Sequence, residues 1–461
     1  MQNATEILSG QCGLAGVQDL LTGAAAQTML RNLLGGLLER PEVLGDCRLQ
    51  RAKFKPGRKL TAYYDLQLHE QGSISAGIRP IAVTWTMPGA KQTVDGTAFE
   101  ATVVQNGLAA PFQKLTASAP DWGMRLQVSP LDPRFPQLVR LSDPCYVRDR
   151  LAAETKSVAN DYTISVIRYR PNQRHVLRYH LLVDATSTQG KGTIFAKLYP
   201  PATSHRHFEP IADQIADWLV TCTSAVTALR PQAIWPEENT IIYPWVNGAP
   251  LSHYVGQPVQ ADYLAQTGSS LRAMHAAPAS ITQDLPAHTL AAQIKAIAQT
   301  CEHIQILLPT VGQKISNLLQ RASALYTKLP QEAPTFIHGD FKADHVLVGP
   351  QQDSNPRLTL IDFDSCAQAD PAFDIGKFLA DLDWTYAQSG QAGLVEAQKD
   401  FLAGYNLEAD APRLLRARIV EALILVKITA HRVPIFKRNW AERTSAMIEQ
   451  AVTVLERIGN N

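Results

Sequence analysis

The chain has 461 residues, of which 45% are hydrophobic and 18% charged, and its 43 basic residues nearly balance its 42 acidic ones. At about 150 residues per domain, this length predicts two to four compact units. The balanced charge gives no electrostatic reason to expect nucleic acid or an anionic membrane as a partner. The N-terminus lacks the pattern of a signal peptide, and no apolar run reaches about 18 residues, so we expect a cytoplasmic protein.

The N-terminal half begins with leucines at helical spacing and then alternates polar and apolar residues as strands do. A basic and aromatic strand, a proline-containing turn and two further strands occur first from Arg51 and again from Val166. Either the chain contains a degenerate repeat, or the two hairpins are unrelated and only similar in composition. An offset of 115 residues matches Pro56, Lys59 and Tyr64 with Pro171, Arg174 and Tyr179, and an offset of 113 matches Thr84 with Lys197.

The order of these patterns predicts an α+β protein in which strands come first and helices follow. Prolines punctuate residues 129–144, which is typical of a connector between domains. Helical periodicity dominates after about residue 200. We therefore expect an N-terminal cap domain that contains strands (1–150), whose sheet would be the first copy of the repeat, then a β-rich lobe (151–246) and a helical lobe (247–461).

The stretch HGDFKADHVLV, which begins at His338, contains the residues most indicative of chemistry. A second apolar segment, LTLIDFDSC, follows after a loop typical of a hairpin, so the two arms would bring Asp340 and His345 close to Asp362. One carboxylate could then orient a nucleophile, while the imidazole and the other carboxylate hold a divalent cation. Together with a strand lysine, for which Lys197 is the candidate, these groups form the set that phosphoryl transfer requires.

The motifs HGDFKADH, LIDFD and ADPAFDIGKF resemble those of the aminoglycoside phosphotransferase and choline kinase branch of the protein-kinase-like fold. The resemblance covers about residues 160–460. It implies a bilobal fold with a β-rich N-lobe and a helical C-lobe. It also implies an ATP- and Mg²⁺-dependent kinase that phosphorylates a hydroxyl of a sugar, an aminoglycoside or an amino alcohol. The additional N-terminal region is similar to the cap of maltokinases.

The resemblance also implies a role for each site residue. Asp340 would be the catalytic base, Lys342 would lie near the γ-phosphate, and Asp362 would bind magnesium together with His345. Asp374, in the third motif, is expected to brace the loop rather than to touch substrate. The nucleotide-binding residues implied are Lys197 at the α- and β-phosphates, Glu209 or else Asp213 as its carboxylate partner, Asn172 and Gln173 in the turn over the phosphates, and Tyr243, Trp245 and Val246 in the hinge.

The sequence departs from this family at His345, which stands where the loop usually has asparagine. An imidazole prefers softer ions than Mg²⁺ and brings a proton equilibrium near neutral pH. This substitution and the lack of a glycine-rich turn favour a second hypothesis, a pseudokinase-like nucleotide-binding or scaffold protein, whereas the intact Lys197, Asp340 and Asp362 oppose it. A zinc site on His338 and His345 is a third alternative, but no further soft ligand lies nearby.

Overall fold

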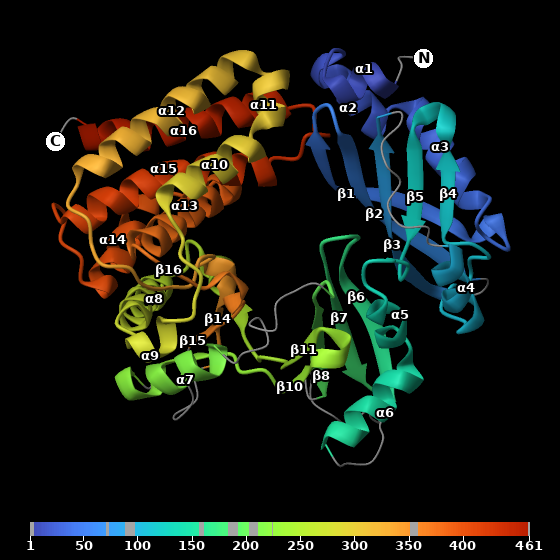
Figure 1. Cartoon of the computed structure of the whole chain (residues 1–461), viewed down its shortest axis with the longest axis horizontal. Helices are drawn as coiled ribbons and strands as arrows, with labels where there is room; N and C mark the ends of the chain where they lie inside the picture. Colours follow the sequence, from blue (N-terminus) through green and yellow to red (C-terminus); the bar gives the residue numbers. More distant parts are fainter. Residues whose placement is uncertain are drawn as a thin grey trace. The chain divides into compact units, whose positions relative to one another are not determined.

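A computed structural model describes residues 4–70, 73–87, 97–155, 161–182, 192–201, 211–223, 225–350 and 358–459. The chain forms two compact units (Figure 1). Strands dominate the first unit and helices the second, which confirms the α+β class. Among the described residues, no helix is both long and apolar enough to cross a membrane. The first unit comprises Met1–Phe208, Gln232–Trp245 and Pro434–Arg438, and the second comprises Glu209–Pro231, Val246–Val433 and Asn439–Asn461.

The first sheet of the first unit is antiparallel, with the strand order β1-β2-β3-β5-β4. Leu60, Ala62 and Tyr64 occupy every second position of β2, so they lie on one face of the sheet, and all three are buried. Helices α1, α2 and α3 lie at this sheet, and the Tyr64 hydroxyl donates to the carbonyl of Leu21 in α2 (3.5 Å). The elements are α1 Ala4–Ser9, α2 Gly13–Thr22, α3 Ala24–Gly35, β1 Leu44–Lys55, β2 Lys59–Glu70, β3 Ser73–Thr86, α4 Thr97–Gln105, β4 Thr116–Ala119 and β5 Met124–Val128.

The second sheet of this unit has the order β10-β11-β8-β7-β6. Tyr63 and Ala82 of the first sheet share a hydrophobic core with Tyr179, Leu198 and Trp235 of the second, so the two sheets pack together.

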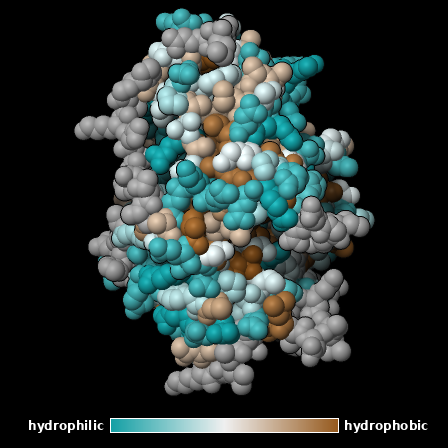
Figure 2. Space-filling view, turned by 90° about the vertical axis from the view of Figure 1, so that its right-hand side faces the viewer, coloured by the Kyte–Doolittle hydropathy of each residue, from teal (hydrophilic) through white to brown (hydrophobic). Residues whose placement is uncertain are grey.

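On the face shown in Figure 2, hydrophilic residues predominate and hydrophobic ones lie in separate groups between them. The elements are α5 Gln137–Leu141, α6 Pro144–Thr155, β6 Tyr162–Arg170, β7 Arg174–Leu181, β8 Thr193–Leu198, β10 Ala233–Trp235 and β11 Thr240–Pro244.

The two five-stranded sheets share one strand order, in which β1, β2, β3, β5 and β4 correspond to β6, β7, β8, β11 and β10. The first hairpin of each sheet turns through a residue with positive φ, 66° at Gly57 and 65° at Asn172. The register is irregular at two places along the β1–β2 pair and at one place along the β6–β7 pair. The pairs that close the two hairpins are Lys55 with Lys59 and Arg170 with Arg174.

This correspondence extends through the remaining strands. A single 3-10 turn joins β4 to β5 and β10 to β11, and each turn is followed by a residue with positive φ, 56° at Gly123 and 45° at Asn239. The first sheet therefore has the registers of the second but carries threonine where the second carries a buried lysine. The equivalent cross-strand pairs are Thr84 with Thr61 and Lys197 with Val176.

The second unit consists of helices around two small sheets, one of order β12-β14-β15-β9 and one that pairs β13 with β16. Its core includes the stacked rings of Phe378 and Phe401, with Phe341 packed against Phe378. The helices are α7 Ile211–Cys222, α8 Gln260–His275, α9 Ala279–Thr282, α10 Leu290–Thr300, α11 Glu302–Leu307, α12 Pro309–Lys328, α13 Ala372–Ser389, α14 Leu394–Tyr405, α15 Pro412–Arg432 and α16 Trp440–Gly459. The strands are β9 Val226–Ala228, β12 Ala249–Pro250, β13 Thr335–Ile337, β14 Val346–Val348, β15 Leu358–Leu360 and β16 Ala367–Ala369.

Candidate functional site

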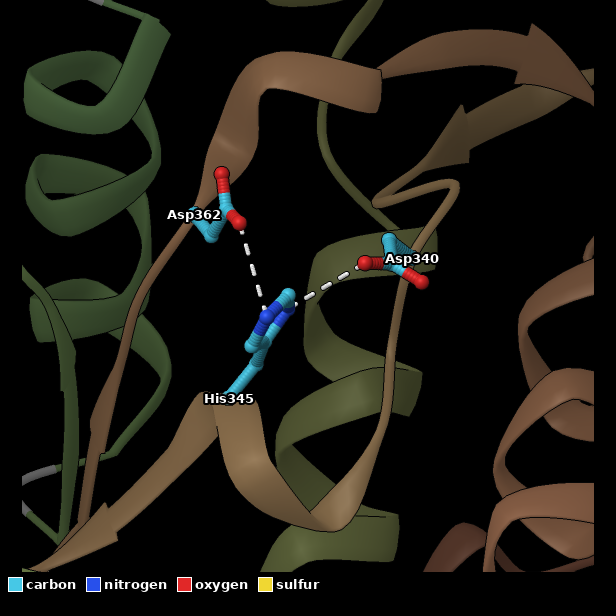
Figure 3. Close-up of side chains that lie close together, drawn as sticks. All are labelled: Asp340, His345 and Asp362. Atoms are coloured by element: carbon cyan, nitrogen blue, oxygen red, sulfur yellow. Dashed lines mark ion pairs between the residues drawn. The ribbon is translucent and has the colours of Figure 1, made fainter. Parts of the chain in front are cut away.

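Three side chains of the second unit converge at the ends of its short strands (Figure 3). Asp340 lies in the loop between β13 and β14, His345 ends that loop, and Asp362 follows β15. His345 Nε2 lies 3.4 Å from Asp362 Oδ2, and His345 Nδ1 lies 3.8 Å from Asp340 Oδ2. The antiparallel pairing of β14 with β15 produces this arrangement, because it sets Val346 opposite Leu360 and thereby holds both segments together.

Helix α13 holds the loop that carries Asp340, which we call the catalytic loop (residues 338–345). Asp374 accepts hydrogen bonds from the backbone N–H groups of His338 (2.6 Å) and Gly339 (2.8 Å). Two turns further along, Asp381 accepts one from Ala343 N–H (3.0 Å). The predicted bracing role of Asp374 is therefore confirmed, whereas sequence reasoning missed Asp381.

Gly339 is required by the shape of the catalytic loop. Its φ of 76° lies in the left-handed region, and a Cβ added there would overlap the carbonyl oxygen of Ser365. Asp362 also has a positive φ, 67°, although it is not a glycine. Aspartate tolerates this conformation better than most residues, and backbone strain of this kind is concentrated at functional sites.

His338 has a structural position. Its Nε2 donates to the carbonyl oxygen of Ile361 (3.1 Å), and its Nδ1 accepts from the backbone N–H of Asp340 (3.3 Å). Both ring nitrogens therefore contact the protein backbone, and neither is directed to the cluster of Asp340, His345 and Asp362. This arrangement opposes a zinc site shared by His338 and His345.

Two lysines neutralise Asp340. Lys342 Nζ lies 2.8 Å from Oδ2, and Lys377 Nζ, from α13, lies 3.2 Å from Oδ1. Burial alone would raise the pKa of Asp340, but the ammonium groups of Lys377 and Lys342 outweigh it and hold that pKa well below its usual range. Asp340 is therefore ionised at neutral pH. Sequence reasoning missed Lys377, although Asp374, Lys377 and Asp381 follow an i, i+3, i+7 spacing that places them on one helix face.

His345 has the properties of a nitrogen ligand. Burial, followed by the charge of Lys342, lowers the pKa of its imidazole to about 3, although Asp362 and Asp340 oppose this shift. The ring is therefore neutral at physiological pH. Its Nδ1 is buried and lacks a hydrogen-bond partner among the described residues. Since neighbouring ligands of a small octahedral ion lie about 3 Å apart, the 3.4 Å between His345 Nε2 and Asp362 Oδ2 fits a shared divalent cation.

The predicted nucleotide-binding residues Lys197, Tyr243 and Trp245 lie in the first unit. Lys197 is largely buried on β8, with its ammonium 5.9 Å from the centroid of the Tyr199 ring. The Trp245 backbone N–H donates to Thr193 (3.1 Å). Val246 is the first residue of the second unit's longest segment, and Glu209 lies outside the described residues. The other acid predicted to pair with Lys197 is Asp213, whose Oδ1 lies 3.6 Å from Arg230 Nη1. Tyr243 lies opposite Phe195 in the pairing of β11 with β8.

The turn between β6 and β7 was predicted to cover the phosphates. In the structure, the backbone N–H of Asn172 donates to Asp132 Oδ2 (2.8 Å), and Gln173 Nε2 donates to the Tyr63 hydroxyl (3.3 Å). Asp132 is fully buried and also contacts His175 (2.8 Å). These contacts favour a structural role for the turn, and a phosphate-binding role for Asn172 and Gln173 stays a prediction.

Comparison with known proteins identifies the family. The model of a family described as the phosphotransferase enzyme family matches residues 178–415, which is more than half of the chain. The chain belongs to this phosphotransferase family. The matched segment contains Asp340, His345 and Asp362 as well as Lys197, whereas the first five-stranded sheet lies outside it. Family membership confirms the resemblance drawn from the three motifs and the protein-kinase-like fold that it implied.

Several solved structures are similar to this member of the phosphotransferase family. A choline/ethanolamine kinase family protein from Mesorhizobium loti has 16% identity and a TM-score of 0.46, with 68% of this chain and 98% of the other covered. A spectinomycin phosphotransferase in complex with ADP and spectinomycin has 16% identity, a TM-score of 0.44 and the same coverages. Choline kinase from Cryptosporidium parvum has 11% identity, a TM-score of 0.44 and coverages of 65% and 90%. A comparison with curated proteins gave no significant match.

Proposed function

We propose that the protein is an ATP- and Mg²⁺-dependent kinase that transfers a phosphoryl group to a hydroxyl of a small molecule. The observation that supports this most strongly is the convergence of Asp340, His345 and Asp362 in a member of a phosphotransferase family. The hydroxyl oxygen of the acceptor forms a bond to the γ-phosphorus, and the bond from this phosphorus to the β,γ-bridging oxygen breaks. The products are a phosphate monoester and ADP, and the hydroxyl proton passes to Asp340 and then to solvent.

Asp340 acts mainly by orienting the acceptor. Because its pKa is held low, its carboxylate is a weak base, and it accepts a hydrogen bond from the hydroxyl rather than removing the proton early. The Nζ of Lys342 lies 2.8 Å from Asp340 Oδ2. When nucleotide binds, this ammonium group could turn from Asp340 to an oxygen of the γ-phosphate. Once Lys342 has turned to phosphate, Asp340 has lost one neutralising cation and accepts a proton more readily.

His345 and Asp362 are the residues that would hold the cation. A divalent cation bound there would neutralise charge on the phosphate oxygens. With Nε2 as the ligand, Nδ1 carries the proton of the neutral ring and faces Asp340 Oδ2 at 3.8 Å. His345 would then orient the carboxylate of Asp340 as well as bind the metal.

The nucleotide would be bound by Lys197 at its phosphates and by the hinge residues Tyr243, Trp245 and Val246 at its base. Backbone groups in an antiparallel pair point alternately toward and away from the neighbouring strand. Since Trp245 N–H donates to Thr193, the carbonyl of Pro244 points away from β8 and is a further candidate for an adenine contact.

The proposal is tested by measuring ADP release from Mg-ATP with a panel of sugars, sugar acids, sugar phosphates, amino alcohols and aminoglycosides, together with identification of the phosphorylated product by mass spectrometry. We expect at least one acceptor to raise ADP release above the rate with water alone. Tight binding of Mg-ATP with no acceptor-dependent transfer would instead favour the pseudokinase-like alternative.

Replacement of His345 by asparagine should keep or raise activity with Mg²⁺ and lower the ratio of Mn²⁺-supported to Mg²⁺-supported activity. The reason is that an amide oxygen is a harder ligand than an imidazole nitrogen. Since the pKa of His345 is about 3, its imidazole is neutral from about pH 5 to 8. Wild type and variant should therefore give kcat/KM profiles of the same shape over this range. An acidic limb near neutrality that disappears in the variant would contradict this assignment.

A further inference from the structure

The two carboxylate oxygens of Asp340 face different surroundings. Oδ2 faces the metal-binding side, where Lys342 and His345 lie at 2.8 and 3.8 Å. Oδ1 faces Lys377 Nζ at 3.2 Å. An acceptor hydroxyl that donates its hydrogen bond to Oδ1, with its oxygen directed at the γ-phosphate, therefore lies next to Lys377. Only 14% of the Lys377 side chain is exposed, so the position of its ammonium is set by the surrounding protein.

A second lysine interacts electrostatically with both Lys377 and Asp340. Lys427 belongs to α15, which packs along α13, and it is partly buried. Burial lowers the pKa of Lys427, the ammonium of Lys377 lowers it further, and the charge of Asp340 opposes both effects. The charges of Lys377 and Asp340 therefore act on Lys427. Together, Lys377 and Lys427 carry one more positive charge than the carboxylate of Asp340 neutralises.

The carboxylates of α13 already have partners within the protein. Asp374 accepts two backbone hydrogen bonds and contacts His275. Asp381 binds Ala343 N–H and Arg432 (2.8 Å), and Asp383 accepts from Gln450 (3.0 Å). All three are buried. A cationic acceptor would therefore bring its charge next to two lysines without gaining one of these carboxylates as a partner.

We propose that the acceptor is an anion, with a carboxylate or phosphate monoester that Lys377 and Lys427 bind while Asp340 orients the hydroxyl. This inference rests on the proposed function and names its acceptor class. Binding of the anion also draws Lys377 away from Oδ1 and leaves that oxygen to the hydroxyl. Two ammonium groups on one partly buried anion give charge-assisted hydrogen bonds, which are the strong class of such contacts. Aminoglycosides and amino alcohols, being amines, are then poor acceptors.

The test compares acceptors that differ only in charge. One set consists of glycerol, glycerate, glycerol 3-phosphate and the amine serinol, and a second set consists of glucose, gluconate, glucose 6-phosphate and glucosamine. In at least one set, we expect kcat/KM to be about 10- to 100-fold higher for an anionic member than for the neutral one. The carboxylate and phosphate members of each set distinguish the two kinds of anion.

Lys377→Met should reduce this preference to near parity by raising KM for the anion, and Lys427→Met should reduce it in part. Lys377→Arg keeps the cation and should retain the preference. Lys399→Met, an exposed lysine on α14, is the matched control and should behave as wild type. Circular dichroism and the KM for ATP verify that each variant is folded.

Two results would overturn the inference and leave the proposed function intact. One is transfer that favours the neutral or amine members, and the other is an anion preference that survives in both Lys377→Met and Lys427→Met. If Mg-ATP binds and no member of either set is phosphorylated by wild type, while amine or neutral acceptors of the broader panel are, the anionic class is again excluded. If no acceptor of any class is phosphorylated, the proposed function fails and the inference fails with it.

Discussion

Asp340→Asn should lower kcat for phosphoryl transfer by about 10²- to 10⁴-fold, the usual contribution of a positioned acid or base. Asparagine has nearly the same shape, but its amide cannot take the hydroxyl proton and presents donors on one side. The substitution also removes the negative charge between Lys342 and Lys377. Because the pKa of Asp340 is lowered in the folded protein, its ionised form stabilises the fold above the unfolded-state pKa, and this contribution is lost as pH falls through the folded-state pKa. A modest decrease in Tm at neutral pH is therefore expected as well.

The measurement is kcat for the best acceptor, together with Kd for ATP by calorimetry. Asp344→Asn is a matched control in the same loop, because the Asp344 carboxylate faces Ser252 Oγ (2.6 Å) at the surface rather than the cluster. The control should retain activity, and both variants should bind ATP. Retention of more than about a tenth of wild-type kcat by Asp340→Asn would be incompatible with the assigned role.

Arg416→Met should destabilise the protein by about 3–5 kcal/mol, the usual cost of removing one partner from a buried ion pair. The Arg416 side chain is fully buried on α15, where it binds Asp370 and Glu332 and donates to the carbonyl of Pro330. Asp370 also accepts from the Tyr326 hydroxyl (2.5 Å). Without the guanidinium, Asp370 would remain a largely buried carboxylate with no countercharge from this arginine. The expected decrease in Tm is roughly 6–20 °C.

Thermal and urea unfolding of the purified protein provide this measurement. Arg413→Met is the matched control, because Arg413 also binds Glu332 but is about one third exposed. Its loss should cost about 1 kcal/mol or less. The double variant Arg416→Met with Asp370→Asn should recover part of the lost stability, since it also removes the uncompensated charge. Equal effects of the two arginine variants would show that burial of Arg416 does not determine its contribution.

The cluster of Asp340, His345 and Asp362 was predictable because local sequence determines it. The two apolar arms form a hairpin, and the side chains that follow each arm must then lie close together. The bracing of the catalytic loop by Asp374 followed from its motif in the same way. The α+β class was predictable because strand and helix periodicities occupy separate parts of the chain.

Lys377 and Asp381 were not predicted, because their importance depends on which helix packs under the catalytic loop, and that is a long-range property of the fold. The turn at Asn172 illustrates the same limit, since its partner Asp132 lies 40 residues away in the sequence. Roles of Lys197, Tyr243, Trp245, Val246 and Glu209 in nucleotide binding remain predictions, as do the domain bounds and the cytoplasmic location.

The two five-stranded sheets of the first unit share their main-chain arrangement but differ at one side chain of functional interest. Strand order, closing pairs and left-handed turn residues agree between them, although the turn residue is glycine in one copy and asparagine in the other. The lysine that phosphate chemistry would need is present in one copy and replaced by Thr84 in the other. The same main-chain geometry therefore accommodates either a lysine or a threonine at this position, so the strand order and turns of a sheet do not by themselves indicate whether it can bind phosphate.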